Sequence, residues 1–335
     1  MGRVSLGAVP LTTRPRRRGA WRTGLAFGLA VALAAGNALA YRHARAFTHF
    51  ASSGRRTPKP EALSTSEKLH ALFAGPVVLR PANRLTPQAL GLEYERRTFV
   101  TADGVDLEAW LVPAPRSHGL VVMFHGYAES KASLLPEARA LHGLGWSTLM
   151  VDFRGSGGSA GDETTVGFRE AEDVAAAFEQ ARSLSAPRVA LFGASMGAAA
   201  VLKAVAEHGL RADALLLESP FDRLVSAVAH RCHALGLPAF PAAYLLVFWG
   251  SWQQHYDGFR HNPVDYAASV DRPTLLMQGD ADDRVSVEEA RAIFDRLRGP
   301  KQLKVFPGVK HQSILRARPA EWTAAVEAFL ERPGG

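Results

Sequence analysis

The chain has 335 residues, of which 47% are hydrophobic and 21% charged, and this composition excludes an intrinsically disordered protein. Its net charge of +7 is uneven, because residues 1–60 carry 11 Lys and Arg but no Asp or Glu, whereas the remainder carries 28 basic and 32 acidic side chains. The body is therefore mildly acidic and lacks a basic stripe, so we expect no nucleic-acid partner. The single cysteine, Cys232, excludes an intramolecular disulfide.

The N-terminal segment has the order of features of an export signal. Five arginines precede an uncharged run rich in Ala and Leu at 25–40, and Ala38-Leu39-Ala40 fits a small-x-small cleavage site. The arginines are Arg14, Arg16, Arg17, Arg18 and Arg22. The alternative is an uncleaved membrane anchor, although a helix of this run covers only about 24 Å of a hydrocarbon core about 30 Å thick. In both cases the arginines stay in the cytoplasm, which places the body on the periplasmic or other extracytoplasmic side of the membrane.

A third possibility is an apolar N-terminal helix that packs on a cytoplasmic protein. We assign residues 1–45 to a signal peptide or N-terminal membrane anchor, and residues 46–96 to a linker and lead-in segment. Residues 52–60 are small, polar and proline-containing, as is typical of a linker, and a helix is expected within 61–80. The main domain is then expected to occupy residues 97–333. The oligomeric state is not encoded in any pattern of this sequence.

Short strands alternate with helices along the main domain. Residues 97–100 and 106–112 flank the Asp103-Gly104 turn and predict a β-hairpin. Apolar runs predict further strands at 119–124, 147–151, 189–192, 214–217, 274–278 and 303–306. Helical spacing separates them at 131–144, 167–184, 198–207, 287–297 and 319–331. This alternation predicts an α/β fold with a doubly wound, mostly parallel sheet, in which ligands bind beyond the carboxyl ends of the strands.

A candidate nucleophile lies at one of these carboxyl ends. Gly193-Ala194-Ser195-Met196-Gly197 follows the strand at 189–192 and precedes a helix, which is the strand–turn–helix context of a G-x-S-x-G nucleophile elbow. The glycines are expected because side chains there would collide with neighbouring backbone. The hydroxyl of Ser195 needs a base, and His311, a short loop after the last strand, is the best placed of the 12 histidines. The backbone N–H of Met196 is placed to stabilise an oxyanion.

A carboxylate is expected to orient His311, and the loop after the strand at 274–278 offers three. Asp280, Asp282 and Asp283 compete there, and Glu218, after an earlier strand, is a more distant candidate.

These motifs resemble those of the α/β-hydrolase superfamily, in the same order along the chain and over residues 97–330. The superfamily loop G-x-x-D-x-x-V fits Gly279, Asp282 and Val285, so the resemblance selects Asp282 and implies a catalytic triad of Ser195, Asp282 and His311. His125-Gly126-Tyr127 resembles the oxyanion loop of the superfamily. The resemblance therefore implies the Tyr127 N–H as the second oxyanion donor, with His125 supporting the loop.

A further loop, residues 152–159, fits the pattern D-x-R-G-x-G-x-S, which also occurs in this superfamily. We expect a structural ion pair between Asp152 and Arg154, with Glu170 and Asp173 on the helix surface or anchoring loops. None of the four is expected to take part in catalysis.

The stretch between Glu218 and Thr274 is longer than a crossover helix needs and is rich in aromatic residues. We expect a helical cap insertion at about 220–270, whose aromatics either line an acyl pocket or simply pack the cap onto the body. The sequence thus predicts a serine esterase for a small or lipid-like ester, with thioesterase or peptidase variants. No metal-ligand spacing or nucleotide motif is present, so no cofactor is expected. The alternative of a different class is a catalytically silent, membrane-tethered binding module on the same fold.

Overall fold

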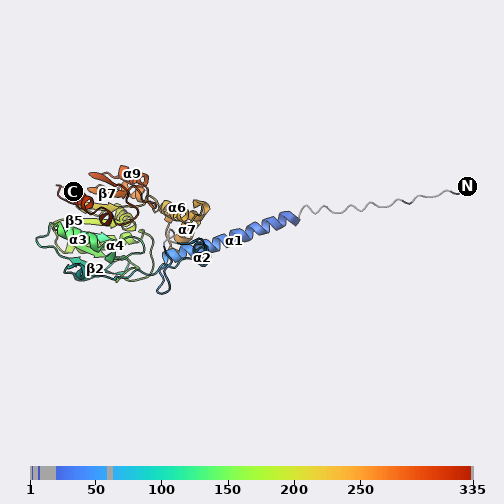
Figure 1. Ribbon diagram of the computed structural model, residues 1–335, viewed down its shortest axis with the longest axis horizontal. Coiled ribbons are helices and arrows are strands. Elements are labelled where there is room, and N and C mark those ends of the chain that lie inside the picture. Colours follow the sequence, from blue (N-terminus) through green and yellow to red (C-terminus); the bar gives the residue numbers. More distant parts are fainter. Residues whose placement is uncertain (1, 3–6, 8–19, 59–62, 333–335) are drawn as a thin grey trace. The chain divides into compact units, whose positions relative to one another are not determined.

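The computed structural model describes residues 2, 7, 20–58 and 63–332, and its contacts divide the chain into two units, residues 1–39 and 40–335 (Figure 1). Helix α1, Ala20–Thr48, begins in the first unit and continues into the second. By length and composition alone, its stretch Trp21–Thr48 could cross a membrane. The expected arginines at 14, 16, 17 and 18 lie outside the described residues.

The second unit is built on one eight-stranded sheet. Its strands are β1 (Glu95–Val100), β2 (Asp106–Val112), β3 (Leu120–Phe124), β4 (Ser147–Val151), β5 (Val189–Ala194), β6 (Ala214–Glu218), β7 (Thr274–Gly279) and β8 (Lys301–Phe306). They lie in the order β1-β2-β4-β3-β5-β6-β7-β8. Only the pairs β1–β2 and β2–β4 are antiparallel. The predicted α/β class with a mostly parallel sheet is confirmed.

Helices cover both faces of the sheet, because successive residues of a strand point to opposite sides. In β3, Val122 and Phe124 belong to the hydrophobic core on one face, and Val121 and Met123 to the core on the other. The first core is completed by α4 (Glu170–Ser183), α5 (Met196–His208), α8 (Pro263–Ala267) and α9 (Val287–Arg296). The second is completed by α3 (Leu135–Gly143), α10 (Ile314–Ala317) and α11 (Pro319–Leu330).

The helix expected at 131–144 is divided into a 3-10 turn, η3 (Lys131–Leu134), and α3. Pro136 explains the division, because proline has no N–H to donate and its ring would collide with the carbonyl group four residues earlier. As a residue of the first turn of α3, it is well tolerated.

Between β6 and β7 the chain forms α6 (Leu224–Ala234), α7 (Ala239–Gln254) and the 3-10 turn η4 (Gly258–Arg260) before α8. Val247 of α7 and Leu224 of α6 join a small core with Val285, which follows β7. The N-terminal lead-in holds α2 (Thr65–Ala74), which begins with a capping box of Ser64 and Glu67, and the 3-10 turn η2 (Pro87–Leu90).

The last turns of α1 belong to the second unit. Ala44 and Thr48 are buried, and the Thr48 carbonyl oxygen accepts a hydrogen bond of 2.9 Å from the N–H of Thr164. Just beyond the helix, Phe50 is also buried, and its N–H donates to the carbonyl oxygen of Asp162 at 2.7 Å. The segment from residue 41 to residue 50 is therefore part of the folded body.

Candidate active site

Ser195 occupies a strained turn between β5 and α5. Its φ of 52° and ψ of −111° are unfavourable for a residue with a side chain, and such strain is concentrated at functional sites. The flanking glycines allow the turn to close. A Cβ at Gly193 would lie 2.6 Å from the Ala198 nitrogen, and one at Gly197 would lie 2.4 Å from the carbonyl oxygen of Phe124. The second approach also places the end of β3 directly against the first turn of α5.

The structure brings the three predicted triad side chains together from three loops. The Oγ of Ser195 lies 3.1 Å from Nε2 of His311, and Nδ1 of His311 lies 2.8 Å from Oδ2 of Asp282. These residues follow β5, β8 and β7, respectively. The arrangement is that of a nucleophile, a base within hydrogen-bonding distance, and an acid that orients the base.

Asp282 is held in its anionic form although its side chain is completely inaccessible to solvent. Burial alone raises the pKa of Asp282. The hydrogen bond and charge of His311, together with the N–H groups of Arg284 and Val285, outweigh this effect and leave the pKa below its usual value. A buried carboxylate of this kind can stabilise a histidine that becomes positively charged.

The competing carboxylates have other positions. Asp283 is exposed, and Asp280 accepts a hydrogen bond of 2.6 Å from the N–H of Gly308. The side chain of Glu218 accepts a hydrogen bond from Nε1 of Trp322. Of the four candidates, only Asp282 is bonded to His311.

The loop after β3 is supported by a buried, neutral histidine. Nδ1 of His125 donates to the carbonyl oxygen of Gly126 at 2.8 Å, and Nε2 accepts from the N–H of Phe153 at 3.1 Å. Because one ring nitrogen donates and the other accepts, the ring is uncharged, and burial accordingly lowers the pKa of His125. Its position fits the expected supporting role.

Tyr127 and Met196 flank the elbow with backbone N–H groups that donate to no acceptor in the described part of the chain. The phenol of Tyr127 donates to the Phe47 carbonyl oxygen at 2.7 Å. Burial raises the pKa of Tyr127 to about 12, so the phenol keeps its proton. The guanidinium carbon of Arg231, from α6, lies 4.7 Å from the centre of the Tyr127 ring. Nothing in the sequence pattern pointed to the Phe47 carbonyl group, because backbone acceptors leave no signature in sequence.

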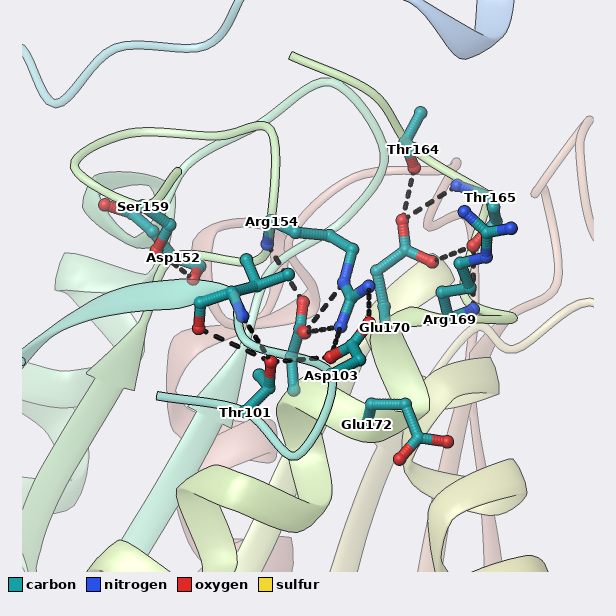
Figure 2. Close-up of polar contacts among 12 residues, drawn as sticks. Thr101, Asp103, Asp152, Arg154, Ser159, Thr164, Thr165, Arg169, Glu170 and Glu172 are labelled. Atoms are coloured by element: carbon teal, nitrogen blue, oxygen red, sulfur yellow. Dashed lines mark hydrogen bonds and ion pairs between the residues drawn. The ribbon is translucent and has the colours of Figure 1, made fainter. Parts of the chain in front are cut away.

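The expected ion pair between Asp152 and Arg154 is wrong. Asp152 instead pairs with the fully buried Lys131, whose Nζ also lies 2.8 Å from Glu108. Arg154 pairs with Asp103 at 2.7 Å and with Asp173, and Figure 2 shows its guanidinium group directed toward Asp103. Asp152 and Arg154 do not pair because each has a different partner. Lys131 binds Asp152, whereas Asp103, in the turn between β1 and β2, binds Arg154.

Glu170 and Asp173 are completely buried anchors and not surface residues. One oxygen of Glu170 accepts from Thr164 and the other from Thr165 and Gly167, which fixes the loop before α4 (Figure 2). This loop is the one that binds the end of α1 through Thr164.

A second pair of buried acids was not expected from the sequence. Glu137 of α3 accepts a hydrogen bond of 2.5 Å from Oγ of Ser313, two residues after His311. Burial, and next the nearby Glu137, raise the pKa of Glu218 to about 8. Glu137 lies among the buried residues of α3, and a glutamate at such a position was the feature of the sequence that could have indicated this pair.

Comparisons with known proteins agree with the fold. Residues 115–254 match the family model described as serine aminopeptidase, S33. An uncharacterised protein of Mycobacterium tuberculosis is 32% identical over 216 residues, which are 63% of this chain and 70% of that protein. The uncharacterised protein YqkD of Bacillus subtilis is 25% identical over 71% of this chain and 80% of its own length. The esterase Pf2001 of Pyrococcus furiosus superimposes with a TM-score of 0.65 and 27% identity, over 76% of this chain and 97% of the esterase.

The fold and these comparisons define a hydrolase built on a doubly wound, mostly parallel sheet. The chain belongs to the α/β-hydrolase family.

Proposed function

We propose that this hydrolase is a membrane-bound serine esterase that cleaves a carboxylic ester through an acyl-enzyme on Ser195. The observation that carries the proposal is the continuous chain of contacts from Ser195 through His311 to Asp282, at 3.1 and 2.8 Å. Thioesters and amides react by the same steps and are variants of the proposal.

In the first half-reaction, Oγ of Ser195 attacks the substrate carbonyl carbon while Nε2 of His311 takes the hydroxyl proton. The N–H groups of Tyr127 and Met196 stabilise the resulting oxyanion, and each such donor contributes about 3–4 kcal/mol to the transition state. The carbon–oxygen bond of the ester then breaks, and His311 returns the proton to the leaving alcohol. In the second half-reaction, water attacks the acyl-enzyme and His311 takes its proton. As the bond between the acyl carbon and Oγ breaks, His311 returns this proton to Oγ, and the acid and free Ser195 are released.

The localisation belongs to the same proposal. Helix α1 contains an uncharged stretch of 19 residues, 23–41, which spans about 28 Å and so matches a hydrocarbon core of about 30 Å. The sequence estimate considered only residues 25–40, whereas the helix continues in both directions. Asn37, near the end of the stretch, donates to the Leu33 carbonyl oxygen at 2.9 Å, which lowers the cost of placing its amide in lipid. The proposal therefore includes a signal or anchor at residues 1–45 and an extracytoplasmic body, since the arginines before the stretch favour a cytoplasmic N-terminus.

The test uses the full chain in detergent and its Ser195→Ala variant. We expect the wild-type protein to react with a fluorophosphonate and to hydrolyse p-nitrophenyl esters, and the variant to lose about 10⁶-fold in kcat. A folded wild-type protein that neither labels nor hydrolyses any ester would overturn the proposal and favour the membrane-tethered binding module.

A further inference from the structure

Helix α7 has an unusual surface. None of its 16 residues carries a charge, although a helix that faces water normally presents charged side chains on its outer side. Its inner side is formed by the buried residues Ala243, Val247, Gly250 and Gln254. On the outer side, Tyr244, Phe248 and Trp252 recur at intervals of four and are 48%, 48% and 60% exposed, respectively. The backbone of Phe240 is not helical, but its ring packs on that of Tyr244, with the ring centres 5.7 Å apart, and Phe240 is 74% exposed. We call these four residues the aromatic face.

The aromatic face adjoins the point where α1 joins the second unit. The ring of Tyr41 lies 5.4 Å from that of Trp249 and 6.3 Å from that of Trp252. Nε2 of Gln253 donates to the Tyr41 carbonyl oxygen at 2.9 Å. These contacts fix residue 41 against α7, whatever the direction taken by residues 1–39.

Helix α2 contacts the next residues of α1 and also exposes apolar side chains. Its carbonyl groups at Ala74 and Leu72 bond to the side chains of Arg42 and His43, at 3.0 and 2.7 Å. Leu69 and Phe73 of the same helix are 53% and 67% exposed. In Figure 1, α2 and α7 lie at the same end of the body.

The depth of Tyr41 in a bilayer follows from the length of the uncharged stretch. Residues 23–41 cover about 28 Å of a hydrocarbon core of about 30 Å, so Tyr41 falls at its boundary and Arg42 among the headgroups. Trp and Tyr are enriched at that boundary, where an apolar ring and a polar edge are both accommodated. Tyr41, Trp249 and Trp252 form a cluster of this composition.

We propose that the aromatic face is a docking surface for the lipid bilayer and that the substrate is the acyl ester of a lipid taken from it. The second claim, the lipid substrate, rests on the proposed esterase function. Tyr127, whose N–H is assigned to the oxyanion, donates its phenol proton to Phe47, six residues after Tyr41. Six residues of helix span about 9 Å, so the oxyanion loop lies close to the membrane boundary.

The first test measures depth directly. The full chain, with Cys232→Ser, carries a spin label at Phe248→Cys and is reconstituted in vesicles of phosphatidylcholine and phosphatidylglycerol. The matched control is Val100→Cys in the same background, because Val100 is 59% exposed on the edge strand β1. We expect the label at 248 to collide more with oxygen than with a water-soluble nickel complex, and the label at 100 to show the reverse.

Two outcomes would overturn the docking surface. In the first, the label at 248 is as accessible to the nickel complex as the label at 100. In the second, labels at 248 broaden each other and continue to do so on dilution with lipid, which would show that a second copy of the chain covers the face.

The second test is kinetic and uses the unlabelled full chain with its native cysteine. Phe248→Asp and Trp252→Asp should lower hydrolysis of a long-chain ester in vesicles at least tenfold and leave hydrolysis of soluble p-nitrophenyl acetate unchanged. The control Val100→Asp should leave hydrolysis of both substrates unchanged. Equal rates on the vesicle ester for Phe248→Asp and Val100→Asp would overturn the inference. The reaction of Ser195 with a fluorophosphonate separates the two proposals. If the spin label at 248 lies in the lipid but Ser195 does not react, the docking surface is supported and the esterase function is rejected.

Discussion

Asp282 and Asp283 are neighbours in sequence with opposite surroundings. The Asp282 carboxylate is inaccessible to solvent and accepts from His311, from Gln278 Nε2 at 3.2 Å and from two backbone N–H groups. Asp283 is exposed. The difference gives a test in which the same chemical change is made at two adjacent positions.

We predict that Asp282→Asn lowers kcat about 10⁴-fold, because an amide can donate to His311 and then favours the wrong tautomer of the imidazole. Asp283→Asn serves as the matched control and should stay within about twofold of the wild type. Ester hydrolysis by both purified variants checks this prediction. Equal losses at the two positions would remove Asp282 from its proposed role.

At the scale of secondary-structure elements, the oxyanion loop is connected to the last turn of α1. The Phe47 carbonyl group is one of the last four in that helix, which find no partner within the helix itself. Tyr127 supplies the partner, and its ring contacts both Phe50 and Arg231. The helix end and the loop after β3 thus hold each other in place.

Tyr127→Phe removes this hydrogen bond and keeps the ring and the backbone N–H. We predict a fall in kcat of about 5–30-fold with little change in KM, as expected for the loss of about 1–2 kcal/mol of positioning. Tyr94→Phe, in a tyrosine that packs on Trp110, is the control and should have the activity of the wild type. A change confined to KM would contradict the proposed function of the loop.

The loop that carries His311 also contacts a pair of buried acids: Ser313 donates to Glu137, and the charge of Glu137 acts on Glu218, for which no ion pair is found among the described residues. Burial, and then Glu137, raise the pKa of Glu218 to about 8, compared with 4.5 in the unfolded chain. Between these two pH values the folded protein binds more protons than the unfolded one. The contribution of this carboxyl group to stability is therefore complete below pH 4.5 and is lost as the pH rises through about 8.

We predict that the wild-type Tm falls over this pH window and that Glu218→Gln falls less. The amide imitates the protonated acid and can still accept from Trp322. Thermal unfolding at several pH values, with the exposed Glu288→Gln as control, measures the difference. Parallel curves for wild type and Glu218→Gln would show that Glu218 does not titrate in this range.

At the scale of the whole molecule, the fold was predictable because its signals are local. Apolar runs and helical spacing defined the strands and helices, and the G-x-S-x-G elbow lies between the predicted strand and helix. The partner of Asp152 was not predictable in this way. Lys131 is 21 residues away and reaches Asp152 only when η3 packs over the end of β4. Likewise, no residue type reveals that the Phe47 carbonyl group accepts from Tyr127.

The boundary between the two units falls after Leu39, one residue before the end of the small-x-small motif at residues 38–40. Every contact described above for the end of α1 is made by Tyr41 or a later residue. Proteolysis after Ala40 would remove the leader and spare the partner of Tyr127. Under the proposed function, maturation at this bond would convert a membrane-anchored protein into one without the anchor, while the loop that holds Tyr127 keeps its contact with Phe47.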